Sequence, residues 1–129
     1  MSTFERVVLI DDHDADSLHH EIVIRRAGFK GEILVFECGP DALDFFEIDD
    51  MSVPTCVLLD INMPMMDGFE VAARATAILA NKPMARVMML TSSDAPSDIQ
   101  RAKELPIVKR FLTKPLEVDL VKRLMEATG

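Results

Sequence analysis

The sequence predicts an α/β fold, a doubly wound parallel sheet of five strands with helices on both faces. Apolar runs alternate with helical patterns along the chain, the runs are rich in branched residues, and no linker, repeat or low-complexity tract interrupts them. Short connections with right-handed crossovers convert such alternation into a parallel sheet. Because 129 residues is a usual length for one domain, we expect a single domain over residues 1–129, with no output domain attached.

Five runs are candidate strands. Residues 7–10, 57–59 and 86–90 are the most apolar and end at polar residues, which predicts strands buried on both faces. Residues 32–36 and 108–112 are weaker candidates that complete the set. The last run has mixed polarity, which is typical of an edge strand.

Helical patterns fill the segments between the runs. The first, residues 15–27, places Ala15, Leu18 and Ile22 on one face and stops at Gly28, a natural left-handed helix end. The clearest apolar stripe lies between Gly68 and Pro83 and has helical periodicity. Its members are Phe69, Ala72, Ala73, Thr76, Ala77 and Ala80.

The other three helical patterns are shorter or weaker. Pro40, at an early helical position, opens one that continues to Phe46. Residues 97–105 form the weakest, with few apolar side chains for an inner face. The last pattern follows Pro115 and groups Leu116, Leu120, Val121 and Leu124 on one side.

Composition excludes several classes of function. The chain has 14 Lys and Arg against 22 Asp and Glu, a formal net charge of −8, so direct binding to nucleic acid is not expected. The first apolar run is too short for a signal peptide or a membrane span, which predicts a cytoplasmic protein without membrane contact. Cys38 and Cys56 are the only cysteines, and Cys56 is expected to be a buried free thiol because its neighbours are apolar.

Polar side chains follow the predicted strands at the edge where an open parallel sheet binds its ligands. Asp11 and Asp12 follow the first strand, Asp60 ends the third, Thr91 follows the fourth and Lys114 lies just past the fifth. If these strands are neighbours, the side chains converge in one crevice. Each residue alone is ambiguous, because an acidic pair often caps a helix, a lone lysine is usually solvated, and a strand-end threonine often bonds to backbone.

Three carboxylates in one crevice repel each other, and a folded protein tolerates this through a raised pKa, a counter-charge or a bound cation. Oxygen ligands select a hard cation. Mg²⁺ fits best, because it binds through few carboxylates and leaves positions for phosphate oxygens. The sequence therefore predicts a magnesium site for phosphate chemistry.

Motifs occur in a fixed order along the chain: Asp11–Asp12, Asp60 with Asn62, Pro64, Asp67–Gly68, Thr91 and Lys114–Pro115. In order, spacing and placement at strand ends, they resemble the receiver domain of two-component response regulators, the family of the chemotaxis regulator. The resemblance spans essentially the whole chain. This resemblance implies a flavodoxin-like three-layer sandwich with five helices and the strand order 2-1-3-4-5.

The resemblance also implies a chemistry. Asp60 would accept a phosphoryl group from a phosphohistidine on a histidine kinase or a histidine phosphotransfer protein. Asp11, Asp12, Asp60 and the backbone carbonyl of Asn62 would hold Mg²⁺, with Asp11 in a supporting position. Lys114 would neutralise a phosphoryl oxygen, so that catalysis is positioning plus electrostatics.

A conformational switch is implied by the same resemblance. The Thr91 hydroxyl would move to bond the phosphoryl group, and Phe111 would move into the space that Thr91 vacates, although a plain core role for Phe111 is the alternative. Asn62 and Ser93 match positions that tune self-dephosphorylation. The turn at residues 104–107 departs from the small, Gly-containing turn of the family, which leaves the output face open.

Partner docking is expected from Ala15, Leu18 and the Pro115–Leu116 turn, the places where receivers dock a kinase helix pair. Met65 and Met66 would either add apolar contact at this rim or pack under their loop. The three histidines, His13, His19 and His20, are expected to be solvated, because their spacing does not support a metal site.

The functional prediction is a stand-alone, phospho-accepting signalling protein that catalyses its own phosphoryl transfer and self-dephosphorylation, as a monomer or weak phosphorylation-dependent dimer. A phosphorelay intermediate is equally compatible, and a phosphate-independent binding module is the weaker alternative. A phosphatase of the haloacid dehalogenase kind needs a second Asp two residues after its nucleophile, where Asn62 stands. A flavin-binding domain needs a phosphate-cradling loop after the first strand, where Asp11 and Asp12 stand instead.

Overall fold

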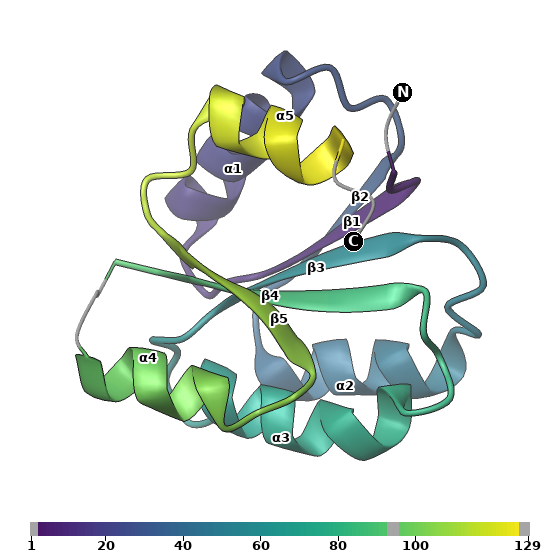
Figure 1. Ribbon diagram of the computed structural model, residues 1–129, viewed down its shortest axis with the longest axis vertical. Coiled ribbons are helices and arrows are strands. Elements are labelled where there is room, and N and C mark those ends of the chain that lie inside the picture. The colour runs from purple at the N-terminus through teal and green to yellow at the C-terminus, as the bar shows by residue number, and fades with distance from the viewer. Residues whose placement is uncertain (1–2, 93–95, 127–129) are drawn as a thin grey trace.

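Helices and strands alternate along the chain. The computed structural model describes residues 3–92 and 96–126. Within them, five parallel strands pair in the order β2-β1-β3-β4-β5 (Figure 1). The predicted α/β fold and strand order are therefore confirmed. The elements are β1 (Arg6–Ile10), α1 (Asp14–Arg26), β2 (Glu32–Phe36), α2 (Gly39–Ile48), β3 (Thr55–Asp60), α3 (Gly68–Leu79), β4 (Ala85–Thr91), α4 (Pro96–Lys103), β5 (Val108–Thr113) and α5 (Val118–Glu126).

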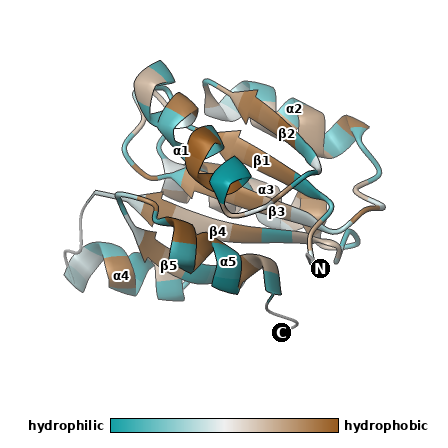
Figure 2. Ribbon diagram, turned by 90° about the horizontal axis from the view of Figure 1, so that it is seen from above, coloured by the Kyte–Doolittle hydropathy of each residue, from teal (hydrophilic) through white to brown (hydrophobic). Residues whose placement is uncertain are grey.

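The helices cover the sheet as two layers, α1 and α5 on one face and α2, α3 and α4 on the other (Figure 1). Successive side chains of a strand point to opposite faces. Val7 and Leu9 of β1 therefore pack in the core under α1 and α5, while Val8 and Ile10 pack under α2 and α3. The central strands β1, β3 and β4 are buried on both faces, as predicted, and form the apolar centre visible in Figure 2.

The predicted stripe of α3 is wrong in its direction. Phe69 and Ala72 are buried as expected, but Ala73, Thr76, Ala77 and Ala80 are exposed. This helix is rich in small residues, so the periodicity of its sequence is compatible with the burial of either of two neighbouring faces. The larger side chains decide between them, and the buried face continues through Val71, Ala75 and Leu79.

The apolar face predicted for α1 is on the outside. Leu18 and Ile22 are 59% and 44% exposed. The buried residues of this helix are Ser17, His20, Val23 and Ile24. The expectation that His20 is solvated is therefore wrong, because α1 turns it inward, and burial lowers the pKa of its imidazole.

The end of α1 and the burial of Cys56 agree with the predictions from the sequence. Gly28 has a positive φ of 99° just past α1, the left-handed conformation predicted there. Cys38 and Cys56 are free, and burial raises the pKa of the Cys56 thiol to about 12. Among the described residues, no helix has both the length and the apolar character that crossing a bilayer requires.

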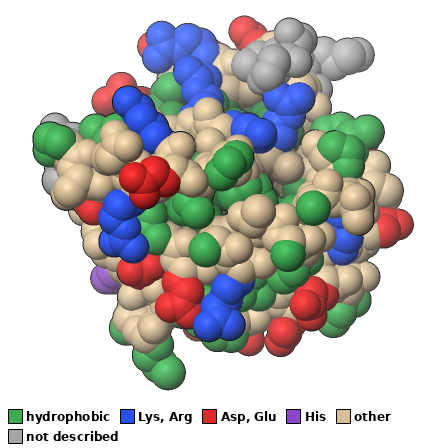
Figure 3. Space-filling model, turned by 60° about the horizontal axis from the view of Figure 1, so that its bottom comes forward, with side chains coloured by type: hydrophobic (Ala, Val, Ile, Leu, Met, Phe, Trp, Pro, Cys, Tyr) green, Lys and Arg blue, Asp and Glu red, His purple; other side chains and the backbone are tan. Residues whose placement is uncertain are grey.

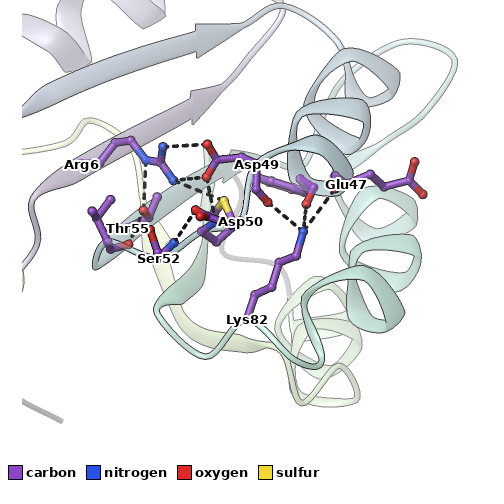
Figure 4. Close-up of polar contacts among 10 residues, drawn as sticks. Arg6, Glu47, Asp49, Asp50, Ser52, Thr55 and Lys82 are labelled. Carbon is purple, nitrogen blue, oxygen red and sulfur yellow. Dashed lines mark hydrogen bonds and ion pairs between the residues drawn. The ribbon is translucent and has the colours of Figure 1, made fainter.

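A second polar group lies at the amino end of the sheet, and we call it the amino-end network (Figure 4). Its members are Arg6 and Thr55, which are buried, and Asp49 and Lys82, which are partly buried. Arg6 Nη2 donates to Asp49 Oδ2 at 2.8 Å, and Arg6 Nε donates to Thr55 Oγ1 at 3.1 Å. Lys82 Nζ donates to the carbonyls of Phe46 and Asp49 at 2.6 and 2.8 Å, which satisfies the last turn of α2. This network ties β1, α2 and the segment before β4 together.

Candidate functional site

Three carboxylates meet at the carboxyl end of the sheet, and we call this group, Asp11, Asp12 and Asp60, the acidic pocket. Asp60 is the last residue of β3, and Asp11 follows β1 directly. Because Ile10 pairs with Leu59, the next residues, Asp11 and Asp60, lie side by side. The nearest ligand atoms of the pocket and of His13 all lie within 4.8 Å of one another. The predicted convergence of acidic side chains is thus present.

Lys114 lies between the pocket and α1. Its Nζ is 3.0 Å from Asp11 Oδ2, 3.1 Å from Asp16 Oδ2 and 3.3 Å from Asp60 Oδ1. The backbone N–H of Lys114 donates to the Thr91 carbonyl at 2.6 Å, which joins the ends of β4 and β5. Burial opposes the charge of Lys114, but hydrogen bonds and attraction from the carboxylates outweigh it and raise the pKa of the ammonium. Lys114 therefore stays charged and contacts Asp60.

The surroundings of Asp60 disfavour its charged form. Burial, followed by the charge of Asp11, raises the pKa of the Asp60 carboxyl, against the opposing effects of Lys114 and a backbone hydrogen bond from Asn62. Asp11 and Asp60 are each 3% exposed. Within the described residues, the pocket thus concentrates more negative charge than Lys114 neutralises.

The pocket has the properties of a site for a hard cation. Asp12 Oδ1 is buried and has no hydrogen-bond partner among the residues that the structure describes. Among the described side chains, only His13 Nδ1 comes within ion-pair distance of this oxygen, at 3.1 Å. An orphaned carboxylate oxygen beside two further carboxylates is a donor set that Mg²⁺ prefers, so the residues fit the ion.

The loop after Asp60 is shaped by Gly68, the first residue of α3. A Cβ at this position would collide with the Asp60 carbonyl oxygen and lie 2.8 Å from Ile61 Cα. The Gly68 N–H donates to the Ile61 carbonyl at 2.9 Å, and Asp67 Oδ1 caps the helix by accepting from Glu70 N. The Asp67–Gly68 motif therefore closes a tight loop that keeps Asn62 exposed beside the pocket.

The predicted switch residues lie on neighbouring strands. Thr91 is fully buried at the end of β4, beside the pocket. Phe111 on β5 pairs with Met89, two residues before Thr91, and is half-buried against the core under α4. Ser93, one of the two residues linked with self-dephosphorylation, lies outside the described residues.

The docking residues separate into two groups. Ala15, Leu18 and Pro115 are exposed around the pocket, as docking requires. Leu116 is 2% exposed and packs in the core under α1 and α5, because the chain turns inward before α5 begins at Val118. The expectation that the Leu116 side chain forms part of a docking surface is therefore wrong.

The two methionines of the loop also differ. Met65 is fully exposed with a positive φ of 69°. Met66 packs against the core near Gly39. Packing under the loop therefore holds for Met66, whereas the Met65 side chain is exposed and its docking role stays a prediction.

Sequence reasoning missed Asp16 and the position of His13. Asp16 ion-pairs with Lys114, and this contact lowers the pKa of its carboxyl. Asp16 lies in the first turn of α1, and no local pattern marks it as the partner of Lys114, which is 98 positions away. His13 is exposed, as expected, but its ring also contacts the acidic pocket.

The fold and the site define a class of protein, a doubly wound domain whose buried aspartate lies beside a cation pocket and a lysine. The family model of the response regulator receiver domain matches residues 7–126, and the chain belongs to this family. It is thus a receiver domain of two-component signalling. Receiver domains bind Mg²⁺ at an acidic pocket and generally interact with histidine kinases or phosphotransfer proteins.

Individual relatives support this assignment. The chain is 32% identical to the response regulator Rcp1 of Synechocystis, over 90% of this chain and 81% of that protein. It is 31% identical to the probable methanogenesis regulatory protein FilR2 of Methanothrix harundinacea, over 93% of this chain and 78% of that protein. Among solved structures, a response regulator receiver protein from Dyadobacter fermentans superposes with a TM-score of 0.84 at 26% identity, covering 94% of each chain. The chain spans about half the length of other curated relatives.

Proposed function

We propose that this chain accepts a phosphoryl group on Asp60 in a magnesium-dependent reaction and signals by protein contact. The observation that carries the proposal is the position of Asp60, a buried carboxylate with a raised pKa, 3.3 Å from Lys114 and beside the orphaned oxygen of Asp12. The site residues act together: Asp60 as nucleophile, Lys114 and Thr91 on the phosphoryl oxygens, and Asp11, Asp12, Asp60 and the Asn62 carbonyl as ligands of Mg²⁺.

The phosphoryl donor is a phosphohistidine on a histidine kinase or phosphotransfer protein. An Asp60 carboxylate oxygen attacks phosphorus, the P–N bond breaks, and the histidine nitrogen keeps the bonding electron pair and takes up a proton. The product is an acyl phosphate. When bound, Mg²⁺ supplies positive charge that reduces repulsion between the carboxylate and the phosphoryl oxygens.

Lys114 is suited to hold the product. Its ammonium already contacts Asp60 and is anchored by Asp11 and Asp16 at 3.0 and 3.1 Å. A cation fixed in this way needs little reorganisation when negative charge develops on the phosphoryl group. We expect Lys114→Ala to keep the fold but to lose the response to phosphorylation, measured as the change in Phe111 side-chain NMR signals on adding Mg²⁺ and phosphodonor.

The output surface proposed is the face of α4, β5 and α5. A groove of about 200 Å³ there is lined by the apolar side chains of Ile99, Ala102, Val108 and Phe111 and by Lys103, Lys109 and Arg110. On the face drawn in Figure 3, Lys and Arg side chains are more numerous in the upper half of the view, and Asp and Glu side chains are more numerous in the lower half. The chemistry fits an acidic partner with apolar side chains. Phe111, which lines the groove, pairs with Met89 on the strand that ends at Thr91.

The decisive experiment uses phosphoramidate, a small donor with a P–N bond, so that no cognate kinase is needed. We expect intact-mass analysis to show one added phosphoryl group with Mg²⁺ present and none after chelation, with removal by hydroxylamine as an acyl phosphate requires. Asp60→Asn should gain no group, whereas Asp44→Asn, an exposed aspartate on α2, should behave as the wild type. Equal labelling of the wild type and Asp60→Asn would refute the assignment.

Two arrangements of this function remain distinct proposals: a stand-alone regulator that acts on a downstream protein, or an intermediate in a phosphorelay. A relay intermediate must pass its phosphoryl group from Asp60 to a second histidine protein. Incubating the labelled chain with a histidine phosphotransfer protein tests this, because only the relay predicts transfer of label.

A further inference from the structure

His13 lies at the rim of the acidic pocket and is held there by the backbone. It is the residue before α1, and its side chain makes no capping hydrogen bond with the helix. Its backbone N–H donates to Asp11 Oδ1 at 2.9 Å. The ring nitrogen Nδ1 lies 3.1 Å from Asp12 Oδ1 and 3.4 Å from Asp11 Oδ1. The imidazole therefore faces the carboxylates, although the side chain is 62% exposed overall.

These separations match the spacing of ligands around one ion. Adjacent ligands of an octahedral ion with bonds of about 2.1 Å lie √2 times that length apart, about 3.0 Å, and opposite ligands about 4.2 Å. The distance between His13 Nδ1 and Asp12 Oδ1 corresponds to an adjacent pair. The four candidate ligand atoms, one each from Asp11, Asp12, His13 and Asp60, stay within 4.8 Å. Small shifts would bring them around a common centre.

We propose that His13 Nδ1 is a ligand of this pocket and that it shifts the pocket's preference from Mg²⁺ toward divalent transition metals. This inference rests on the proposed function, because it concerns the same pocket. Carboxylate and carbonyl oxygens suit Mg²⁺, whereas imidazole suits ions such as Co²⁺, Ni²⁺ and Zn²⁺. An all-oxygen pocket thus becomes a mixed nitrogen and oxygen pocket. Coordination uses the Nδ1 lone pair, so the ring binds with its proton on Nε2.

The other two histidines do not share this position. His20 is buried on the inner face of α1 and is not among the four residues whose ligand atoms cluster. His19 is exposed on the same helix and likewise lies outside that group. His19→Ala is therefore a matched control, since it removes an exposed imidazole of the same helix without touching the pocket.

The test compares Co²⁺ and Mg²⁺ binding by calorimetry in the wild type, His13→Ala and His19→Ala. We expect His13→Ala to lose about tenfold in Co²⁺ affinity and to keep its Mg²⁺ affinity within about twofold. His19→Ala should match the wild type for both ions. An unchanged ratio of Co²⁺ to Mg²⁺ affinity in His13→Ala would overturn the inference.

A spectroscopic measurement identifies the ligand directly. Pulsed EPR of bound Mn²⁺ detects the nuclear spin of a coordinated nitrogen, and we expect this coupling in the wild type and His19→Ala but not in His13→Ala. Absence of nitrogen coupling in a wild type that still binds Mg²⁺ and gains a phosphoryl group would reject the role of His13 alone. Failure of the wild type to bind any of these ions would instead reject the proposed function.

Discussion

At the amino end of the sheet, Arg6 lies between Asp49, Thr55 and Met51 and donates a hydrogen bond to each of them. Lys82 beside it donates to the carbonyls at the end of α2. At the carboxyl end, Asp11, Asp12 and Asp60 face Lys114, and Asp12 Oδ1 has no hydrogen-bond partner in the described part of the chain. Both ends bury charge, but only the first balances it.

The pKa shifts show the same contrast. The hydrogen bond from Arg6 is the largest effect on Asp49 and lowers the pKa of its carboxyl, so folding favours the charged form. Burial raises the pKa of Asp60, so folding disfavours its charged form. A protein that only needed stability would gain by neutralising the second end. A bound cation would instead relieve the retained repulsion, and this would couple the pocket to its ligand.

The largest effect on stability should come from breaking the balanced end. Arg6→Ala removes the guanidinium that ion-pairs with Asp49 and lies over the Phe45 ring. We expect a loss of about 3 kcal/mol in the free energy of unfolding, at the low end for a buried ion pair because Asp49 is partly exposed. Urea denaturation followed by circular dichroism measures it, and the fold should persist at 25 °C.

Arg74→Ala is the matched control for that variant. Arg74 and Glu70 form an exposed ion pair one helical turn apart on α3, with Nη2 and Oε2 at 3.0 Å. Its removal should cost at most about 0.5 kcal/mol. Equal losses for Arg6→Ala and Arg74→Ala would show that the amino-end network contributes no more than a surface ion pair.

The next largest effect should be stabilisation by Mg²⁺ at the unbalanced end. At 100 times its Kd, an ion that binds only the folded chain adds about 2.7 kcal/mol to the free energy of unfolding. We expect this rise in the wild type and in Arg6→Ala, and its loss in Asp12→Asn, measured by thermal denaturation against NaCl of equal ionic strength. A rise of the same size in Asp12→Asn would place the ion elsewhere.

The sequence was informative wherever a signal is local. The sequence directly indicates the apolar runs of β1, β3 and β4 and the polar residues at their ends. Burial on both faces requires consecutive apolar residues, and the strand end is the next polar residue along the chain. Leu116, His20 and the buried face of α3 could not be read, since they depend on how helices pack against the sheet. The pairing of Arg6 with Asp49 joins residues 43 positions apart, and nothing near either one indicates it.

A smaller gain in stability is expected from removing charge at the carboxyl end. Asp60→Asn keeps the shape of the side chain and removes repulsion with Asp11, while Lys114 keeps its contacts with Asp11 and Asp16. We expect an increase of about 1 kcal/mol in the free energy of unfolding without divalent ions. Asp44→Asn should change it by less than about 0.5 kcal/mol. A destabilised Asp60→Asn would show that the Asp60 charge is balanced after all.

The smallest effect, a difference in pH dependence, separates the two ends most clearly. Asp60 has a pKa above its ordinary value of 3.8, so the cost of its charge is relieved as pH falls through the folded pKa. The advantage of Asp60→Asn over the wild type should therefore be full at neutral pH and shrink as the pH falls toward 3.8. Asp49 has a pKa below 3.8, so its stabilising contribution persists to lower pH and is lost only as pH falls through its folded pKa. The gap between the wild type and Arg6→Ala should therefore close below pH 3.8.

Urea denaturation of the three proteins without divalent ions, from pH 7 to pH 3, measures both gaps. If the two gaps closed over the same pH range, the contrast between a balanced and an unbalanced end would be refuted, since it requires folding to move the two pKa values in opposite directions.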